Sequence, residues 1–134
     1  MLQWLKSLLP TPGRSRATLG QRGENVAAKY LRSQGYTIIL RNFRCRLGEI
    51  DIIARDGKSI VFVEVKTRAN DEMASPEDRV DEAKQKQLTS VAKFYLGRYG
   101  VPQPPARFDV VAIVWPPGRD PIVQHIPFAF EPTF

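Results

Sequence analysis

The chain has 134 residues, which is enough for one hydrophobic core and too few for two ordinary domains. Its 43% hydrophobic and 25% charged residues are typical of a folded globular protein and exclude a largely disordered one. Lys and Arg outnumber Asp and Glu by 20 to 14, and the net charge of +6 favours polyanionic partners, although basic surfaces often serve only solubility.

The cysteine content and the apolar segments bound the compartment. Cys45 is the single cysteine, which excludes an internal disulfide, and with only His125 available the chain offers no set of zinc ligands. No apolar run approaches the roughly 20 residues that span a bilayer. The apolar residues 1–9 lack the basic start and cleavage site of a signal peptide. We therefore expect a cytoplasmic protein without a membrane partner.

Residues 1–17 are predicted to form a flexible N-terminal arm, because residues 10–17 combine helix breakers with exposed charge. An ordered domain is expected to begin at Thr18, which has the form of a capping box with Gln21. Small and apolar residues then recur at helical spacing, so the sequence predicts a first helix that ends at Gly35.

Runs of β-branched and apolar residues follow this helix and predict three consecutive strands. Asp56-Gly57 is a strong signal for a tight hairpin between the second and third strands. A polar loop over residues 67–75 then leads to a second helix, with Ser75 as its expected N-cap and Pro76 as its first residue. The three predicted strands cover residues 36–43, 49–54 and 59–66.

The second helix is predicted to keep its 3.6-residue period to Tyr99, with Gly100 as its stop. A buried strand over residues 107–115 and an edge strand over residues 122–126 complete the pattern. This order of helices and strands predicts one α/β domain. The domain is expected to cover residues 18–126, and residues 127–134 are expected to form a C-terminal tail.

Two of the predicted strands carry charged residues where apolar ones are expected. Residues two apart share a face of a strand, so Phe62, Glu64 and Lys66 point to one side. In a central strand the two charges need a metal or a partner to offset desolvation, and a simple Glu-Lys pair is the alternative. Asp51 lies between two isoleucines, and the hairpin register places it near residues 63–65. Two carboxylates at such a place repel each other, and a hard dication relieves the repulsion.

Glu24 and Lys84 stand on the inward stripes of the two predicted helices. Glu24 lies one turn before Ala28, and Lys84 lies one turn before Leu88. A charged side chain is unexpected on such a stripe, although either one could extend past the apolar face to solvent.

Together, the five charged residues supply what the hydrolysis of a phosphodiester requires. A metal ion held by Asp51 and Glu64 would polarise the phosphate and lower the pKa of a bound water, and Lys66 would hold that water or offset transition-state charge. Mg²⁺ is the expected ion because the ligands are few and all oxygen, and Mn²⁺ suits the same ligands. Glu24 and Lys84 would be outer members of the site.

Several motifs of the chain also form a family pattern. They are Gly20-x-x-Gly23-Glu24, Arg41-Asn42, Gly48-Glu49-Ile50-Asp51, Phe62-Val63-Glu64-Val65-Lys66-Thr67-Arg68 and Arg107-Phe108-Asp109-Val110-Val111. Asp51 with Glu64-x-Lys66 resembles the PD-(D/E)xK nuclease superfamily, and the wider set resembles the bacterial UPF0102 family, which is similar to archaeal Holliday-junction resolvases. The resemblance covers roughly residues 18–115 and implies a restriction-endonuclease-like fold, a mixed central sheet flanked by helices.

The resemblance also implies roles for single residues. Glu24, Asp51, Glu64 and Lys66 match the catalytic positions, with Asp51 and Glu64 as the metal ligands. Ile50 stands where the superfamily name has proline, a change that leaves the carboxylate of Asp51 in place. Nucleic acid, expected to be DNA, would be contacted by Lys84, Arg22, Arg44 and Arg68, with Arg14, Arg16, Arg41 and Arg46 as further candidates for phosphate contacts.

Three functions stay open from the sequence. The first is a Mg²⁺-dependent endonuclease for branched DNA, acting as a homodimer because a four-way junction has two symmetric strands to cut. The second is a DNA-binding or assembly module that keeps the nuclease fold but is inactive alone or needs a partner. The third is an α/β protein whose charges are merely structural.

Overall fold

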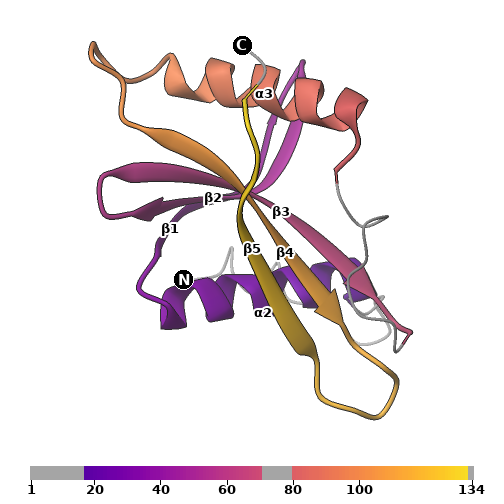
Figure 1. The fold of residues 1–134 in the computed structure, drawn as a ribbon. Helices are drawn as coiled ribbons and strands as arrows, with labels where there is room; N and C mark the ends of the chain where they lie inside the picture. Colours follow the sequence, from indigo (N-terminus) through magenta and orange to yellow (C-terminus); the bar gives the residue numbers. More distant parts are fainter. Residues whose placement is uncertain (1–16, 71–79, 133–134) are drawn as a thin grey trace, which may run out of the picture.

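The computed structural model describes residues 17–70 and 80–132, and the predicted N-terminal arm lies outside them apart from Ala17. Five strands form one mixed sheet in the order β1-β2-β3-β4-β5. Helix α2 covers one face of this sheet and helix α3 covers the other (Figure 1). The expected α/β architecture, a mixed central sheet flanked by helices, is confirmed.

Helix α2 spans Leu19–Ser33 and begins as predicted. The Thr18 hydroxyl accepts the N–H of Gln21 at 3.1 Å, and the Gln21 amide oxygen accepts the N–H of Thr18 at 2.8 Å. These reciprocal bonds satisfy two backbone donors that a helix start leaves unpaired. Gly35 follows the helix in the left-handed region, with φ of 95°.

Strands β1 (Thr37–Cys45), β2 (Gly48–Asp56) and β3 (Ser59–Arg68) follow one another as antiparallel neighbours. The predicted hairpin at Asp56-Gly57 is confirmed, because Asp56 pairs with Ser59 and Gly57 has φ of 62°. Strand β3 lies at the centre of the sheet, between β2 and β4. The prediction that this strand is central is confirmed.

Strand β4 (Ala106–Val114) returns parallel to β3, and strand β5 (Ile122–Phe130) pairs with it in antiparallel fashion as the sheet edge. Strand β5 extends four residues past its predicted end at Ile126. Its register with β4 shifts between Phe108 and Val110, so the strand continues only after a bulge. Pro127 lies within β5 at this shift, and proline inside a strand is typical of an edge strand or a bulge.

Helix α3 spans Glu82–Leu96, so the predicted start at Pro76 and end at Tyr99 are both wrong. Asp81 is the N-cap of this helix, and its carboxylate accepts the N–H of Lys84 at 2.8 Å. Val80 precedes the helix yet lies buried in the core, which made it look like part of the helical stripe. The predicted cap Ser75 lies outside the described residues.

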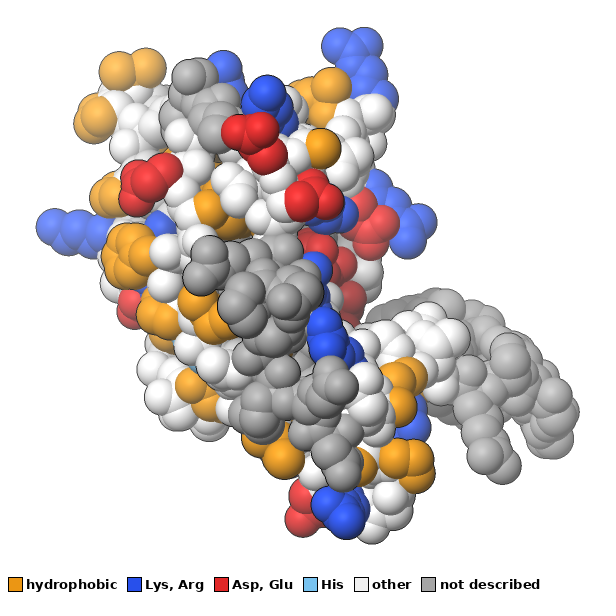
Figure 2. All heavy atoms as spheres, turned by 45° about the vertical axis from the view of Figure 1, so that its right-hand side comes forward, with side chains coloured by type: hydrophobic (Ala, Val, Ile, Leu, Met, Phe, Trp, Pro, Cys, Tyr) orange, Lys and Arg blue, Asp and Glu red, His pale blue; other side chains and the backbone are white. Residues whose placement is uncertain are grey.

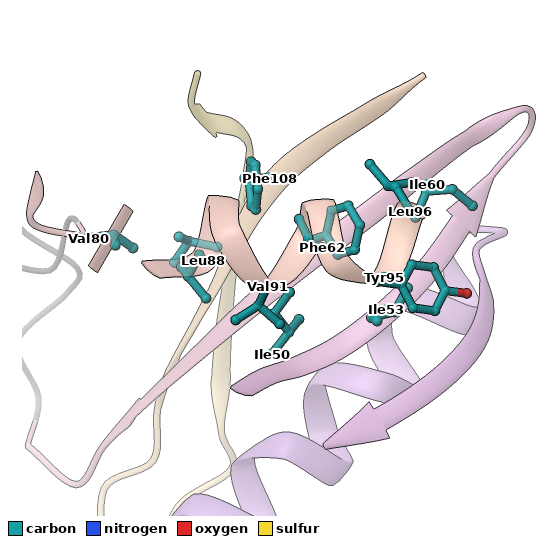
Figure 3. Packing of buried hydrophobic residues seen from close by; sticks show 12 residues of the cluster. Ile50, Ile53, Ile60, Phe62, Val80, Leu88, Val91, Tyr95, Leu96 and Phe108 are labelled. Carbon is teal, nitrogen blue, oxygen red and sulfur yellow. The ribbon is translucent and has the colours of Figure 1, made fainter. Parts of the chain in front are cut away.

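Two cores hold the layers together. Between the sheet and α3, an aromatic cluster packs Phe62 against Tyr95 and Phe108, with ring centroids 5.9 and 5.4 Å apart (Figure 3). Between the sheet and α2, small residues such as Ala27 and Ala28 meet the valines of β3. The small side chains of α2 bring this helix close to the sheet, which matters for the site described next.

Candidate active site

The sheet forks where β2 leaves β3. Backbone pairing between these strands runs up to Ile52 and Val63. Beyond this point β2 stays paired with β1, and β3 stays paired with β4 as far as Arg68. Asp51 and Glu64 are the next residues of the two strands, so their carboxylates stand at the opening of the fork.

Asp51 closes the fork with its side chain. Its Oδ2 accepts the backbone N–H of Val65 at 2.8 Å, a donor that the sheet no longer pairs with β2. Burial is the main cause that raises the pKa of Asp51, and the nearby carboxylates of Glu24 and Glu49 raise it further. The Val65 N–H and the Lys84 ammonium act in the opposite direction. Asp51 is therefore a partly buried carboxylate in an acidic neighbourhood.

Glu64 lies beside Asp51, and its side chain is only 15% exposed. Burial raises the pKa of Glu64 from its ordinary value of 4.5 to about 7, and the charge of Asp51 is the second cause. Two ammonium groups oppose this shift: Lys84, whose Nζ lies 3.8 Å from Oε2 of Glu64, and Lys66 two residues along β3. The structure thus brings four of the five predicted residues together.

Glu24, the fifth, reaches the site from α2. Its Oε1 accepts hydrogen bonds from the Arg41 guanidinium at 2.8 and 3.0 Å and from the Asn42 amide at 3.0 Å. Asn42 has φ of 55°, a left-handed conformation that asparagine tolerates better than most residues. The charge of Glu24 is felt by Asp51, since it raises the pKa of that residue.

Gly23 explains how α2 comes close enough. A Cβ at this position would lie 2.8 Å from Cβ and Cγ2 of Thr67 on β3 and would overlap Oγ1 of the same side chain. Only glycine permits this approach of helix and strand, and Glu24 is the next residue. The Gly23-Glu24 pair of the sequence motif therefore has a steric reason.

The site opens on two sides. Toward α2, a pocket of about 680 Å³ is lined by Glu24, Asp51 and Arg41, among others. Toward α3, a second pocket of about 590 Å³ is lined by Lys84, Gln87 and the residues next to the turn of the β1–β2 hairpin. Glu64 lines neither of these two pockets. Asp51 is thus reached from the α2 side of the sheet and Lys84 from the α3 side.

The donor set fits a hard cation. Among the residues that the structure describes, no three Asp, Glu, His or Cys side chains converge as in a closed metal site. Mg²⁺ does not need such a cage, because it is commonly held by one or two carboxylates and keeps several waters. Asp51 and Glu64 offer two adjacent carboxylates with raised pKa values. Burial is the main cause for both, and the charge of Asp51 raises the pKa of Glu64 further, a repulsion that a dication would offset.

The predicted arginines are spread around this centre. Arg41 is engaged with Glu24, and Arg44 pairs with Glu49 at 3.2 Å while remaining 73% exposed. The guanidinium of Arg22 stacks over the Trp115 ring at 4.2 Å, and Arg68 lies at the end of β3. Arg14 and Arg16 lie outside the described residues. Figure 2 shows acidic and basic side chains next to one another on the face it presents, so this face is not uniformly basic.

The sequence analysis missed a second cluster of charged residues. Asp109, whose side chain is fully buried, accepts hydrogen bonds from Arg107 at 3.0 Å and from the N–H of Phe128 at 3.1 Å, and it contacts His125 Nε2 at 2.7 Å. Arg107 also donates to Tyr36 at 2.6 Å. The signal was present, because Asp109 interrupts an apolar strand just as Asp51 does. This cluster ties β5 to the sheet.

The fold and site define a basic α/β protein with an acidic pair and two lysines at a fork of its mixed sheet. The family described as "Uncharacterised protein family UPF0102" matches residues 23–113, and the chain belongs to this family. Within the part of the chain that the structure describes, no helix is long and apolar enough to cross a bilayer.

Its relatives come from several bacteria and match over most of their length. A UPF0102 protein of Geotalea uraniireducens is 49% identical over 114 residues, which cover 85% of this chain and 90% of the relative. A UPF0102 protein of Geobacter sulfurreducens is 50% identical over 113 residues, 84% and 88% of the two chains. A UPF0102 protein of Nocardia farcinica is 39% identical over 115 residues, 86% and 91% of the two chains.

Proposed function

We propose that this protein is a divalent-metal-dependent endonuclease that cuts DNA, built on the plan of the PD-(D/E)xK superfamily. The observation that carries the proposal is the fork of the sheet. There the carboxylates of Asp51 and Glu64 lie side by side, and the ammonium groups of Lys66 and Lys84 both act to lower the pKa of Glu64. A purely structural role gives no reason to place two partly buried carboxylates side by side, where the charge of Asp51 raises the pKa of Glu64.

Each residue has a task in this chemistry. Asp51 and Glu64 would hold the metal, which, when bound, polarises the phosphate and makes a bound water more acidic. Lys66 offsets the negative charge that develops on the phosphate, or holds the attacking water. Lys84 keeps its ammonium 3.8 Å from Glu64 and can move to a phosphate oxygen. Hydrogen bonds from Arg41 and Asn42 hold Glu24 in place. Glu24 thereby keeps a negative charge on the α2 side of Asp51.

Nucleic acid is the class of substrate that the charge of the chain favours. The net charge of +6 attracts a polyanion, and the exposed Arg44 stands at the rim of the pocket that contains Asp51. Contacts between arginine or lysine and phosphates release counterions, so the affinity for DNA should decrease steeply with salt. We include a homodimer in the proposal for branched DNA, because two symmetric cuts require two sites.

The direct test is a cleavage assay. Labelled single-stranded, duplex, flap and four-way-junction DNA is incubated with the protein in Mg²⁺ or Mn²⁺, and in parallel with EDTA. We expect cutting with metal and none with EDTA. Glu64→Gln and Asp51→Asn should reduce the rate roughly 100-fold or more. Glu82→Gln removes an exposed carboxylate from the first turn of α3 and should leave the rate unchanged.

The outcomes separate the candidate functions. Metal-dependent cutting that Glu64→Gln removes and Glu82→Gln keeps supports the endonuclease. Salt-sensitive binding without cutting of any DNA contradicts it and favours a binding or assembly module. If the protein neither binds nor cuts DNA, the charges of the site serve the fold alone.

A further inference from the structure

The β1–β2 hairpin ends in an exposed leucine between arginines. Cys45 pairs with Gly48, so Arg46 and Leu47 form the two-residue turn. Leu47 is 42% exposed, Arg46 is exposed, and the Arg44 side chain is 73% exposed. The turn of this basic hairpin thus carries a large apolar side chain, where small and polar residues are more usual.

The hairpin is held firmly against the body of the protein. Its backbone pairing continues to the last residues before the turn. Gly48, with φ of 146°, lies close to α3, because a Cβ there would lie 3.0 Å from the Gln87 side chain of that helix. The hairpin thus rests on α3 and presents Leu47 at a fixed position.

The residues next to the turn of the hairpin border the candidate active site. Arg44 and Glu49 line the pocket that contains Asp51, and the same two residues line the pocket that contains Lys84. A DNA strand with a phosphate at the fork would therefore pass directly by the hairpin. The tip would meet the bases next to that phosphate.

We infer that the β1–β2 hairpin is a wedge for DNA, with Leu47 entering the base stack beside the bond that is cut and with Arg44 and Arg46 on the flanking phosphates. This inference rests on the proposed function. Proteins commonly insert apolar side chains between base steps, and the insertion requires that the step be unstacked. The wedge therefore selects DNA in which stacking is already interrupted, at a branch, a flap or a mismatch, because less unstacking free energy is needed there.

The test measures binding without cutting. The full-length protein is titrated in EDTA into an intact duplex and a flap of the same sequence, with 2-aminopurine at the branch point. We expect the wild-type protein to prefer the flap and to increase the 2-aminopurine fluorescence. Leu47→Ser should lower the preference for the flap about tenfold while keeping the affinity for the intact duplex. Leu47→Met, which stays apolar and similar in volume, should keep the preference.

A matched control lies at the opposite edge of the sheet. Ile122 on β5 is 47% exposed, about as much as Leu47, and Ile122→Ser should change neither affinity. An unchanged flap preference in Leu47→Ser would overturn the wedge while leaving the nuclease proposal intact. Failure of the wild-type protein to bind either DNA would instead overturn both. If Leu47→Ser converts a sedimenting dimer to a monomer without affecting the DNA, Leu47 is a subunit contact and the wedge is wrong.

Discussion

Glu64 and Asp51 occupy partly buried positions in which two ionised carboxylates disfavour each other. Glu64 shows the effect most clearly, because burial and the charge of Asp51 raise its pKa to about 7. In the metal-free protein the pair therefore holds a proton near neutral pH. A metal-dependent enzyme requires carboxylates whose mutual repulsion is offset when a cation binds.

This shift predicts how stability depends on pH. The pKa of Glu64 is 4.5 ordinarily and about 7 in the fold, so between these values the folded state binds more protons than the unfolded one. The stabilisation is complete below pH 4.5 and is lost as the pH rises through 7. We expect urea unfolding in EDTA to show that Glu64→Gln raises the free energy of unfolding above that of the wild type by more at pH 8 than at pH 5. The difference between the effects at the two pH values should be roughly 1–3 kcal/mol. An equal effect at both values would contradict the assignment.

The pKa of Asp109 is shifted in the opposite direction to that of Glu64. Burial alone would raise its pKa, but hydrogen bonds from His125, Arg107 and Phe128 outweigh burial and lower it. Asp109→Ala would leave the mostly buried guanidinium of Arg107 without one of its partners and should destabilise the fold by about 3 kcal/mol. Asp120→Ala, at an exposed position, should cost less than about 0.5 kcal/mol. Thermal unfolding of both variants at pH 7 checks this, and equal melting temperatures would refute it.

Asp51 and Asp109 show what the sequence can and cannot predict about single residues. Asp51 could be recognised because a hairpin signal fixes its partner strand, so the proximity of Glu64 followed from counting residues. Asp109 stands in a similar apolar run, but its partner His125 comes from β5, whose register contains a bulge. Pro127 indicates an irregular edge strand, but it does not give the register that brings His125 to Asp109.

At the scale of elements, the close approach of α2 and β3 positions Glu24. Gly23→Ala would push a methyl group into Thr67 and should destabilise the protein by about 1–3 kcal/mol. Gly20→Ala is the matched control on the same helix, since its Cβ would only touch Thr18 Oγ1 at 3.9 Å. We expect that control to be neutral or stabilising by up to about 1 kcal/mol. Chemical unfolding of the two variants measures their free energies of unfolding. Equal values would contradict the prediction and would mean that α2 can move away from β3 to make room for the methyl group.

Element boundaries were predicted unevenly, for physical reasons. The capping box of α2 and the Asp56-Gly57 turn are local signals and were predicted correctly. The start of α3 was wrong because Ser75 followed by Pro76 satisfies the same local rule as Asp81, the cap that the structure contains. The fork between β2 and β3 depends on which strands stay paired with their outer neighbours, and single-strand patterns do not encode that.

At the scale of the whole molecule, the charges of the candidate site come from α2, β2, β3 and α3, and the sheet topology brings them to one place. Strand β3 is central and buried on both faces, so it fixes Glu64 and Lys66 firmly. Asp51 and Lys84 line the two pockets beside the fork. The fold thus gives the candidate site a rigid support, and the net charge of +6 favours a polyanionic partner.

The proposed nuclease activity depends on the joint binding of a divalent cation by Asp51 and Glu64. Calorimetric titration of Mn²⁺ into the wild-type protein, Asp51→Asn, Glu64→Gln and the exposed control Glu82→Gln at pH 7.5 measures this directly. We expect a saturable site in the wild type and in Glu82→Gln, weakened roughly 10- to 100-fold or lost in the other two variants. Equal Mn²⁺ affinity in all four proteins, or no binding in the wild type, would contradict the account.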